Sequence, residues 1–147
     1  SEIATALHRP VIASVGLPFA IAELQALDAL SRAIPDMAAF RAAEERHPSQ
    51  DDRFSLFLYV RDETGQVRAR MFAPLSQTPE DPATGSASGA LAALLASLQD
   101  DESSDFHVTI VQGVEMGRPS VIEASVESGQ VYIAGSCVPV MHGMVML

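Results

Sequence analysis

The feature that most constrains the fold is residues 86–98, a stretch of Ala, Leu, Ser and Gly that contains no charged residue. A helix on the surface of a globular protein presents a polar face, so a helix that is apolar all round must be enclosed. Two arrangements satisfy this requirement: a sheet wrapped around the helix as a roll or half-barrel, or a packing helix in a two-layer sandwich. Both belong to the α+β class, and the residue pattern alone leaves both open.

Strand-like segments flank this helix on both sides. A period of two, bounded by turn residues, predicts strands over residues 11–15, 19–24, 54–60, 66–72, 106–111, 120–127, 131–134 and 138–147. Helical spacing of apolar residues predicts helices over residues 23–33 and 35–46. The remaining segments are predicted as connections over residues 47–52, 74–85 and 99–105. No repeat interrupts this order, so residues 1–147 are predicted to form a single α+β domain.

The charge balance excludes several classes of partner. The chain carries 9 basic and 19 acidic residues, a net charge of −10, and every basic residue is Arg. A surface this acidic repels phosphate, so nucleic acid is excluded as a partner and docking on anionic membranes is disfavoured. The absence of Lys excludes Schiff-base chemistry from this chain. The longest apolar run is too short to span a bilayer, so no membrane partner is expected.

The use of Cys and His points to a reducing compartment and argues against a metal site. A single Cys cannot form an intrachain disulfide, and no signal peptide is visible, so a cytoplasmic location is predicted. The 4 His residues are scattered without ligand spacing, so no metal is expected. Cys137, at the start of the predicted last strand, is predicted to pack in the core.

The start of the enclosed helix is the best candidate site. Thr84 or Ser86 can act as the N-cap, and Gly85 allows a backbone conformation or a close approach that a Cβ would forbid. The N–H groups of Gly85, Ser86 and Ala87 then project from the positive end of the helix dipole and form a ready anion site. Asp81, just upstream, can accept these donors or exchange a proton with a ligand. The alternative is purely structural: Asp81 and Ser86 only cap the helix.

Several motifs follow one another along the chain in the order of a known family. They are Val15-Gly16-Leu17-Pro18-Phe19, Arg70-Met71-Phe72-Ala73-Pro74, Glu80-Asp81-Pro82-Ala83-Thr84-Gly85-Ser86-Ala87, Gln112-Gly113-Val114-Glu115-Met116-Gly117-Arg118-Pro119-Ser120, and a closing strand with Gly135, Val138, Val140 and Gly143. At these residues, and over nearly its whole length, the chain resembles the PhzF (phenazine biosynthesis-like) family. One such motif alone would be weak, whereas the set in register makes the resemblance specific.

The resemblance implies the diaminopimelate epimerase-like fold, in which two pseudo-symmetric halves, each a β-roll around a central helix, enclose the active site between them. The chain resembles only the carboxy-terminal half of such a protein. The glutamate and histidine of the family's amino-terminal half have no counterpart here. We therefore expect residues 1–147 to be one half-barrel that pairs with a missing amino-terminal half, in cis or as another chain, with a homodimer as a further expected assembly.

The resemblance also implies roles for the residues of the helix start. Asp81 matches the family's active-site aspartate and Ser86 its active-site serine, which makes them the predicted catalytic residues. Gly85 matches the glycine whose backbone N–H contacts the substrate carboxylate, and Thr84, Gly85, Ser86 and Ala87 form the predicted substrate-binding set. The implied chemistry is isomerisation by general acid–base proton transfer, without metal or organic cofactor.

Two functions from different classes follow from these expectations. In the first, the chain is half of a PhzF-like isomerase or epimerase that acts on a small carboxylate-bearing metabolite, and it is inactive alone. In the second, it is a non-catalytic module that binds a small carboxylate or dimerises.

Three further features carry expectations of their own. Arg70, which points away from Met71 on its strand, is expected to face solvent or the cleft. Arg118 is expected to pair with a carboxylate or to cap carbonyl groups, with a role in ligand binding as the alternative. A cluster of methionines near the end of the chain is expected to lie in the core or at an interface; its members are Met141, Met144 and Met146.

Overall fold

The computed structural model describes residues 2–48, 53–99 and 105–146. Its strands form one 8-stranded mixed sheet in the order β1-β2-β3-β4-β6-β7-β8, with β5 paired to β4. The strands are β1 (Val11–Ser14), β2 (Pro18–Glu23), β3 (Leu56–Arg61), β4 (Val67–Ala73), β5 (Thr78–Asp81), β6 (Phe106–Gln112), β7 (Ser120–Glu127) and β8 (Gln130–Gly135). The helical elements are α1 (Leu27–Ser31), α2 (Met37–Arg46), the 3₁₀ turn η1 (Pro74–Ser76) and α3 (Gly85–Ser97).

Strand β4 is the centre of the sheet because two strands share one of its edges. Its first part pairs in parallel with β6, with Val67 opposite Ile110, and its last part pairs antiparallel with β5, with Met71 opposite Asp81. Its other edge pairs antiparallel with β3 over its whole length. The ends of β5 and β6 therefore meet beside β4, and this junction lies where α3 begins.

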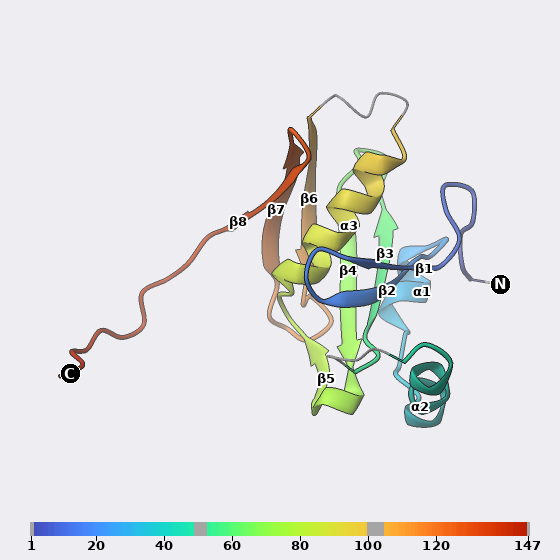
Figure 1. The fold of residues 1–147 in the computed structure, drawn as a ribbon, viewed down its shortest axis with the longest axis horizontal. Coiled ribbons are helices and arrows are strands. Elements are labelled where there is room, and N and C mark those ends of the chain that lie inside the picture. Colours follow the sequence, from blue (N-terminus) through green and yellow to red (C-terminus); the bar gives the residue numbers. More distant parts are fainter. Residues whose placement is uncertain (1, 49–52, 100–104, 147) are drawn as a thin grey trace.

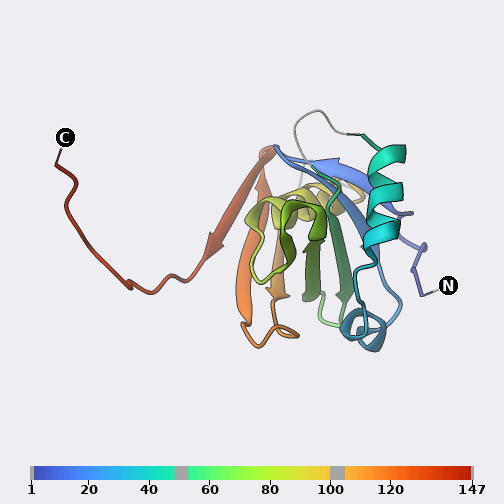
Figure 2. The same cartoon turned by 90° about the horizontal axis from the view of Figure 1, so that it is seen from below.

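The sheet curves around α3. The predicted roll or half-barrel is therefore confirmed, and the alternative, a two-layer sandwich, is wrong. Figure 2 shows the strands as an arc with the helix on its concave side, and Figure 1 shows α3 crossing the face of the sheet. The helix contacts β1, β2, β6, β7 and β8, which lie at both ends of the arc. The absence of charge on this helix is explained by that enclosure, since most of its side chains have no access to water.

Small residues on α3 let the edge strands close over it. A Cβ at Gly89 would lie 3.2 Å from a methyl of Val15 and 3.3 Å from a methyl of Val131. These two neighbours lie beside β1 and on β8, at opposite ends of the sheet. Gly89 therefore allows α3 to lie close to both ends of the sheet. The remaining core is filled by aliphatic side chains and by Phe57 and Tyr59, which are fully buried on β3.

Helices α1 and α2 lie on the outer side of the arc (Figure 2). The predicted start of α2 is confirmed, because the Asp36 carboxylate accepts hydrogen bonds from the N–H groups of Ala38 and Ala39 at 2.8 and 3.1 Å. The helix predicted over residues 23–33 is shorter than expected. Glu23 is the last residue of β2, and the helix, α1, begins only at Leu27 and ends at Ser31. Leu24 and Leu30 form a small second apolar cluster with the outer face of β3.

Two predicted segments are wrong. Residues 74–85 are not a plain loop, because they contain η1 and β5 before α3 begins. A strand was also predicted over residues 138–147, but residues 138–146 form no strand. After β8 the chain extends away from the sheet (Figure 1). The alternating apolar residues of this segment have no neighbouring strand to pair with in the part of the chain that the structure describes.

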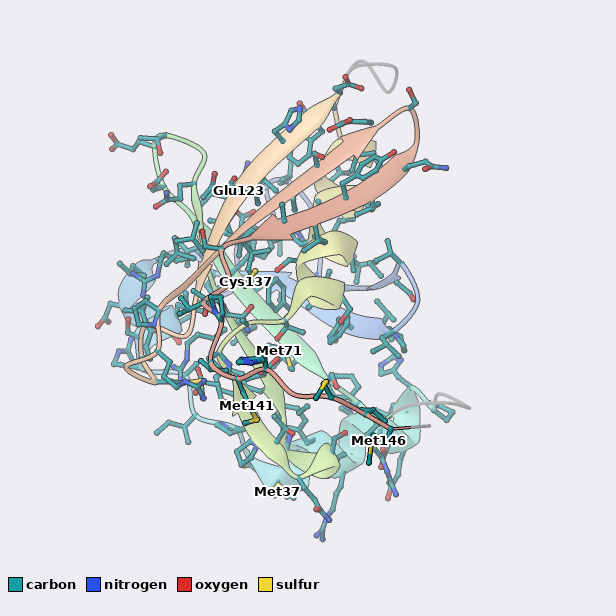
Figure 3. The ribbon with its side chains drawn as sticks, turned by 90° about the vertical axis from the view of Figure 1, so that its left-hand side faces the viewer. Met37, Met71, Glu123, Cys137, Met141 and Met146 are labelled. Carbon is teal, nitrogen blue, oxygen red and sulfur yellow. The ribbon has the colours of Figure 1, made fainter. Side chains whose placement is uncertain are left out.

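The side chains of this carboxy-terminal segment are exposed. Cys137 is exposed, so its predicted place in the core is wrong. Met141, Met144 and Met146 are 89%, 97% and 96% exposed, which excludes them from the core of this chain. Figure 3 shows Cys137, Met141 and Met146 strung along this extended segment. The alternative expectation for the methionines, an interface, stays a prediction.

Residues 49–52 and 100–104 of the two predicted polar connections lie outside the described residues. No described helix has the length and apolar character needed to cross a membrane.

Candidate functional site

Successive residues of β5 point to opposite faces of the sheet, and this separates two neighbouring carboxylates. Glu80 lies against the outer face, where Arg70 of β4 binds it through two charge-assisted hydrogen bonds of 2.8 Å. Asp81, opposite Met71, lies at the inner edge near the start of α3. Glu80 therefore forms an ion pair with Arg70 on the outer face, whereas the Asp81 carboxylate lies near the start of α3.

Arg70 ties three elements together. Its guanidinium binds Glu80 on β5 and also donates to the carbonyl groups of Leu30 and Ala33, each at 2.9 Å, at the end of α1. It lies 4.8 Å from the centre of the Phe72 ring. The residue is only 7% exposed, and the hydrogen bond to Glu80 raises the pKa of Arg70. The expectation that Arg70 faces solvent or a cleft is therefore wrong. Its side chain is buried and fixes the position of β5.

Gln112 holds the loop between β5 and α3. This residue ends β6 on the inner face of the sheet and is fully buried. Its amide nitrogen donates to the carbonyl of Asp81 at 2.6 Å and to the hydroxyl of Thr84 at 2.9 Å. Its amide oxygen accepts the backbone N–H of Thr84 at 3.1 Å. The loop is therefore bound at both ends by one side chain from the adjoining strand.

The Thr84 hydroxyl links this amide to the carboxylate. It donates to Oδ2 of Asp81 at 2.7 Å, while its oxygen accepts the Gln112 amide N–H at 2.9 Å. Thr84 is the N-cap residue of α3 by position, yet neither Thr84 nor Ser86 makes a side-chain capping bond there. The side-chain capping predicted for these two residues is thus wrong. The structural alternative, in which Asp81 and Ser86 only cap the helix, also does not describe the geometry.

Gly113 allows the turn after β6 to lie against this loop. Its φ is +77°, and a Cβ there would clash with the carbonyl oxygen of Arg118 and would lie 2.7 Å from the carbonyl oxygen of Pro82. Both observations exclude any other residue without movement of the turn or of the loop. The expected close approach at Gly85 is not found, because a Cβ there would make only an ordinary contact of 3.5 Å with Ile133.

The first turn of α3 presents unpaired donors. Among the described residues, no partner is found for the N–H groups of Gly85, Ser86 and Ala87 or for the Ser86 hydroxyl. Gly85 and Ser86 are half-buried, whereas Ala87 is 0% exposed. Gly85 and Ser86 are therefore more accessible from the surface than Ala87.

An open cavity of about 510 Å³ adjoins the helix start. Ala83 and Gly85 form one side of it, and Pro119, Ile133 and Gly135 contribute from β7, β8 and their flanks. Asp81 and Ser86 do not line this cavity. The structure therefore brings Asp81 and Thr84 into contact and places Gly85 at a cavity. The predicted catalytic and binding roles of Asp81, Thr84, Gly85, Ser86 and Ala87 stay predictions.

The Arg118 side chain has no partner in the described part of the chain. It is exposed, and no ion pair or carbonyl contact of its side chain is found there, so its expected pairing within the chain is wrong and its alternative role in ligand binding stays a prediction. The described residues contain no group of His, Cys, Asp and Glu able to hold a metal ion.

The sequence pattern of β6 marks Gln112 as an unusual residue. The inner face of β6 follows the alternation of Val108, Ile110 and Gln112, so an amide stands where the pattern calls for an apolar residue. A buried amide needs hydrogen-bond partners, which marks the position as one that binds another segment.

Comparisons with known proteins place the chain among phenazine biosynthesis-like proteins. Residues 3–143 match the PhzC-PhzF family, described as phenazine biosynthesis-like protein. The chain is 33% identical to an uncharacterized isomerase of Mesorhizobium japonicum, over 97% of this chain and 49% of that protein. It is 36% identical to a trans-2,3-dihydro-3-hydroxyanthranilate isomerase of Pseudomonas fluorescens, over 90% of this chain and 44% of that protein.

The fold of the chain is also similar to that of a solved protein of this family. A PhzF-family phenazine biosynthesis protein from Bacillus anthracis superposes with a TM-score of 0.72 at 24% identity. The match covers 90% of this chain and 46% of that one. The chain thus spans about half the length of the curated relatives that it matches.

Proposed function

The chain belongs to the phenazine biosynthesis-like (PhzC-PhzF) family, and from that premise we propose that it supplies one wall of the active site of a cofactor-independent isomerase. The substrate is a small metabolite that carries a carboxylate. One observation carries the proposal: the Asp81 carboxylate is held beside the first turn of a buried helix whose N–H groups have no partner among the described residues. An anion-binding element and a proton-transfer group therefore stand next to each other.

In the proposed reaction, the helix start binds the substrate carboxylate. The N–H groups of Gly85 and Ser86, with the Ser86 hydroxyl, donate to its oxygens at the positive end of the dipole. The Asp81 carboxylate then exchanges a proton with the substrate. An isomerisation takes a proton from one atom and adds one to another, so no net proton, electron or group is transferred and the substrate's composition is unchanged.

We propose that the opposite wall comes from an amino-terminal half, in cis or as another chain. The match to about half of each relative supports this assignment. On this proposal residues 1–147 are the carboxy-terminal half, and the chain alone is inactive because the opposite wall is missing. A homodimer is a further proposed assembly.

The test is turnover by the complete protein. As the first probe we choose trans-2,3-dihydro-3-hydroxyanthranilate, because relatives of the chain carry that compound in their names. The reaction is run in D₂O, and deuterium incorporation into product is measured by mass spectrometry. Asp81→Asn is expected to lower turnover at least ~100-fold, the range for a proton-transfer residue. The control is Asp28→Asn, which removes an exposed carboxylate on α1. Near-normal turnover by Asp81→Asn would refute the role of Asp81.

The alternative is carboxylate binding without turnover, and the unpaired donors of the helix start support it equally. The two functions differ in one result. If the complete protein binds the probe but incorporates no deuterium, and Asp81→Asn binds it as well as the unmodified protein does, the chain is a binding module.

A further inference from the structure

One fully buried amide controls the hydrogen-bond directions around Asp81. The backbone N–H of Thr84 can only donate, so the atom of Gln112 that lies 3.1 Å from it must be the amide oxygen. The Gln112 nitrogen is then the atom that faces the Thr84 hydroxyl and the Asp81 carbonyl, and it donates to both. The orientation of the amide is fixed by its partners.

This orientation decides where the Thr84 proton goes. The hydroxyl oxygen already accepts a hydrogen bond from Gln112, and its single proton points to Oδ2 of Asp81 at 2.7 Å. Oδ2 is thereby held in place, while Oδ1 of Asp81 has no hydrogen-bond partner among the described residues. The two oxygens of this carboxylate are unequal, and Oδ1 is the one left for a ligand.

We propose that Gln112 is a positioning residue that acts through Thr84 to orient the Asp81 carboxylate, with Oδ2 held and Oδ1 presented for proton transfer. This inference rests on the proposed function of Asp81 and names two residues that serve it. Neither Gln112 nor Thr84 exchanges a proton with the substrate. Both are buried, with Gln112 at 0% and Thr84 at 7% exposure, so water does not compete for these bonds.

A purely structural role for Gln112 predicts a different outcome. If the amide only held the loop, its loss would lower stability and would weaken substrate binding and turnover together. Misorientation of one carboxylate by a fraction of an ångström instead reduces the chemical step and spares binding. The distinction is therefore visible in kcat against KM.

The kinetic experiment uses the complete protein with the deuterium assay. Thr84→Val removes the hydroxyl at nearly constant shape and is expected to lower kcat ~10–100-fold with little change in KM. Thr84→Ser keeps the hydroxyl and is expected to restore most of the activity. Thr78→Val is the control, because it removes an exposed hydroxyl on β5. If Asp81→Asn is inactive but Thr84→Val keeps its kcat, the positioning role is wrong and the proposed function stands.

A spectroscopic experiment on the chain itself does not depend on turnover. The chain is labelled with ¹³C at the aspartate side-chain carboxyl carbons, and the Asp81 signal is assigned by its loss in Asp81→Asn. Thr84→Val and Gln112→Leu are expected to move this signal in the same direction, while Thr84→Ser and the exposed control Gln66→Leu leave it in place. An Asp81 signal that is unchanged in Thr84→Val overturns the proposal, even if Gln112→Leu fails to fold.

Discussion

At the scale of single residues, the helix start depends on side chains that come from a distant part of the sequence. Gln112 is separated from Thr84 by 28 positions, and the next residue, Gly113, lets the following turn lie against Pro82. These two residues determine where Asp81 stands although neither belongs to the predicted site.

Substitution of Gly113 tests how tightly the turn lies against the loop. Gly113→Ala is expected to destabilise the chain by more than Gly129→Ala, because both glycines have nearly the same φ, +77° and +76°, but only Gly113 has a neighbour near the Cβ position. The strain of the positive φ costs about 1–2 kcal/mol in each variant, and the clashes with the carbonyl oxygens of Arg118 and Pro82 add to it at Gly113. Urea unfolding of the two variants gives the comparison. Equal losses would mean that the turn and the loop both move without cost.

Substitution of Ser86 tests the anion site. Ser86→Ala is expected to weaken binding of benzoate, a simple carboxylate probe, by about tenfold, because a hydrogen bond to a charged group contributes about 1.5–3 kcal/mol. Binding to the chain is followed by NMR titration of the amide signals of the first turn of α3. Ser97→Ala, at the opposite end of the same helix, is the control. The same affinity in both variants would exclude Ser86 from the site.

The sequence proposes the residues of the helix start but not the residues that support them. Asp81 and Ser86 lie within one motif next to the enclosed helix, so local pattern makes them candidates, and their roles stay predictions. The contacts of Gln112 depend on β5 and β6 sharing an edge of β4, and no local pattern shows which strand lies beside which. Arg70 was misplaced for the same reason, since its partner Glu80 lies on a strand that had not been predicted.

At the scale of elements, β5 is attached to the sheet both by its backbone pairing with β4 and by the ion pair between Arg70 and Glu80. The strand is only 4 residues long and begins Thr78-Pro79, so its backbone provides few hydrogen bonds. Arg70 supplies the missing attachment through Glu80 and joins β5 to the end of α1. This explains why an irregular, Pro-containing segment nevertheless presents Asp81 at a defined place.

Removal of Arg70 is therefore expected to be costly. Arg70→Met leaves Glu80 and the carbonyl groups of α1 without their donor and is expected to lower the free energy of unfolding by about 3–5 kcal/mol. Arg32→Met is the matched control, because Arg32 makes its ion pairs on the surface, where solvent screening leaves such pairs with little effect on stability. Chemical denaturation of both variants is the measurement. A loss in Arg70→Met no larger than in the control would show that β5 is held by other contacts.

Most elements were predictable because period and turn signals agree with tertiary burial. The errors have physical causes. The strand β5 carries Pro79 and exposed side chains, so it lacks the usual strand signal. The segment over residues 138–146 has an alternating pattern but no partner strand within the described chain, and a strand needs a neighbour for its hydrogen bonds.

At the scale of the whole molecule, the carboxy-terminal segment is the most exposed apolar part. Val138, Val140, Met141, Met144, Val145 and Met146 are between 80% and 97% exposed. Soluble proteins rarely leave such an apolar stretch in water, and an exposed one marks an interaction site. Figures 1 and 3 show that this segment extends away from the sheet after β8. It can therefore contact another protein chain while the half-barrel keeps its structure.

Polar substitution of this segment tests the expected assembly. The chain alone is expected to associate as its concentration is raised, and Met141→Ser, Met144→Ser and Met146→Ser together are expected to shift it towards a single copy. Size-exclusion chromatography with light scattering measures the mass. Met37→Ser, at a partly exposed methionine on α2, is the control. A single-copy mass for the unmodified chain at all concentrations would exclude self-association through this segment.

The shared edge of β4 has a consequence for the order in which the molecule folds. β5 can pair with β4 as soon as the local chain is made, whereas β6 must return across α3 before Ile110 meets Val67. Contacts between residues so far apart in sequence form slowly, because a long loop must close first. Asp81 is therefore in place early on its strand but gains the amide of Gln112 only when β6 arrives. Completion of the site and closure of the roll therefore depend on the same event, the docking of β6 against β4.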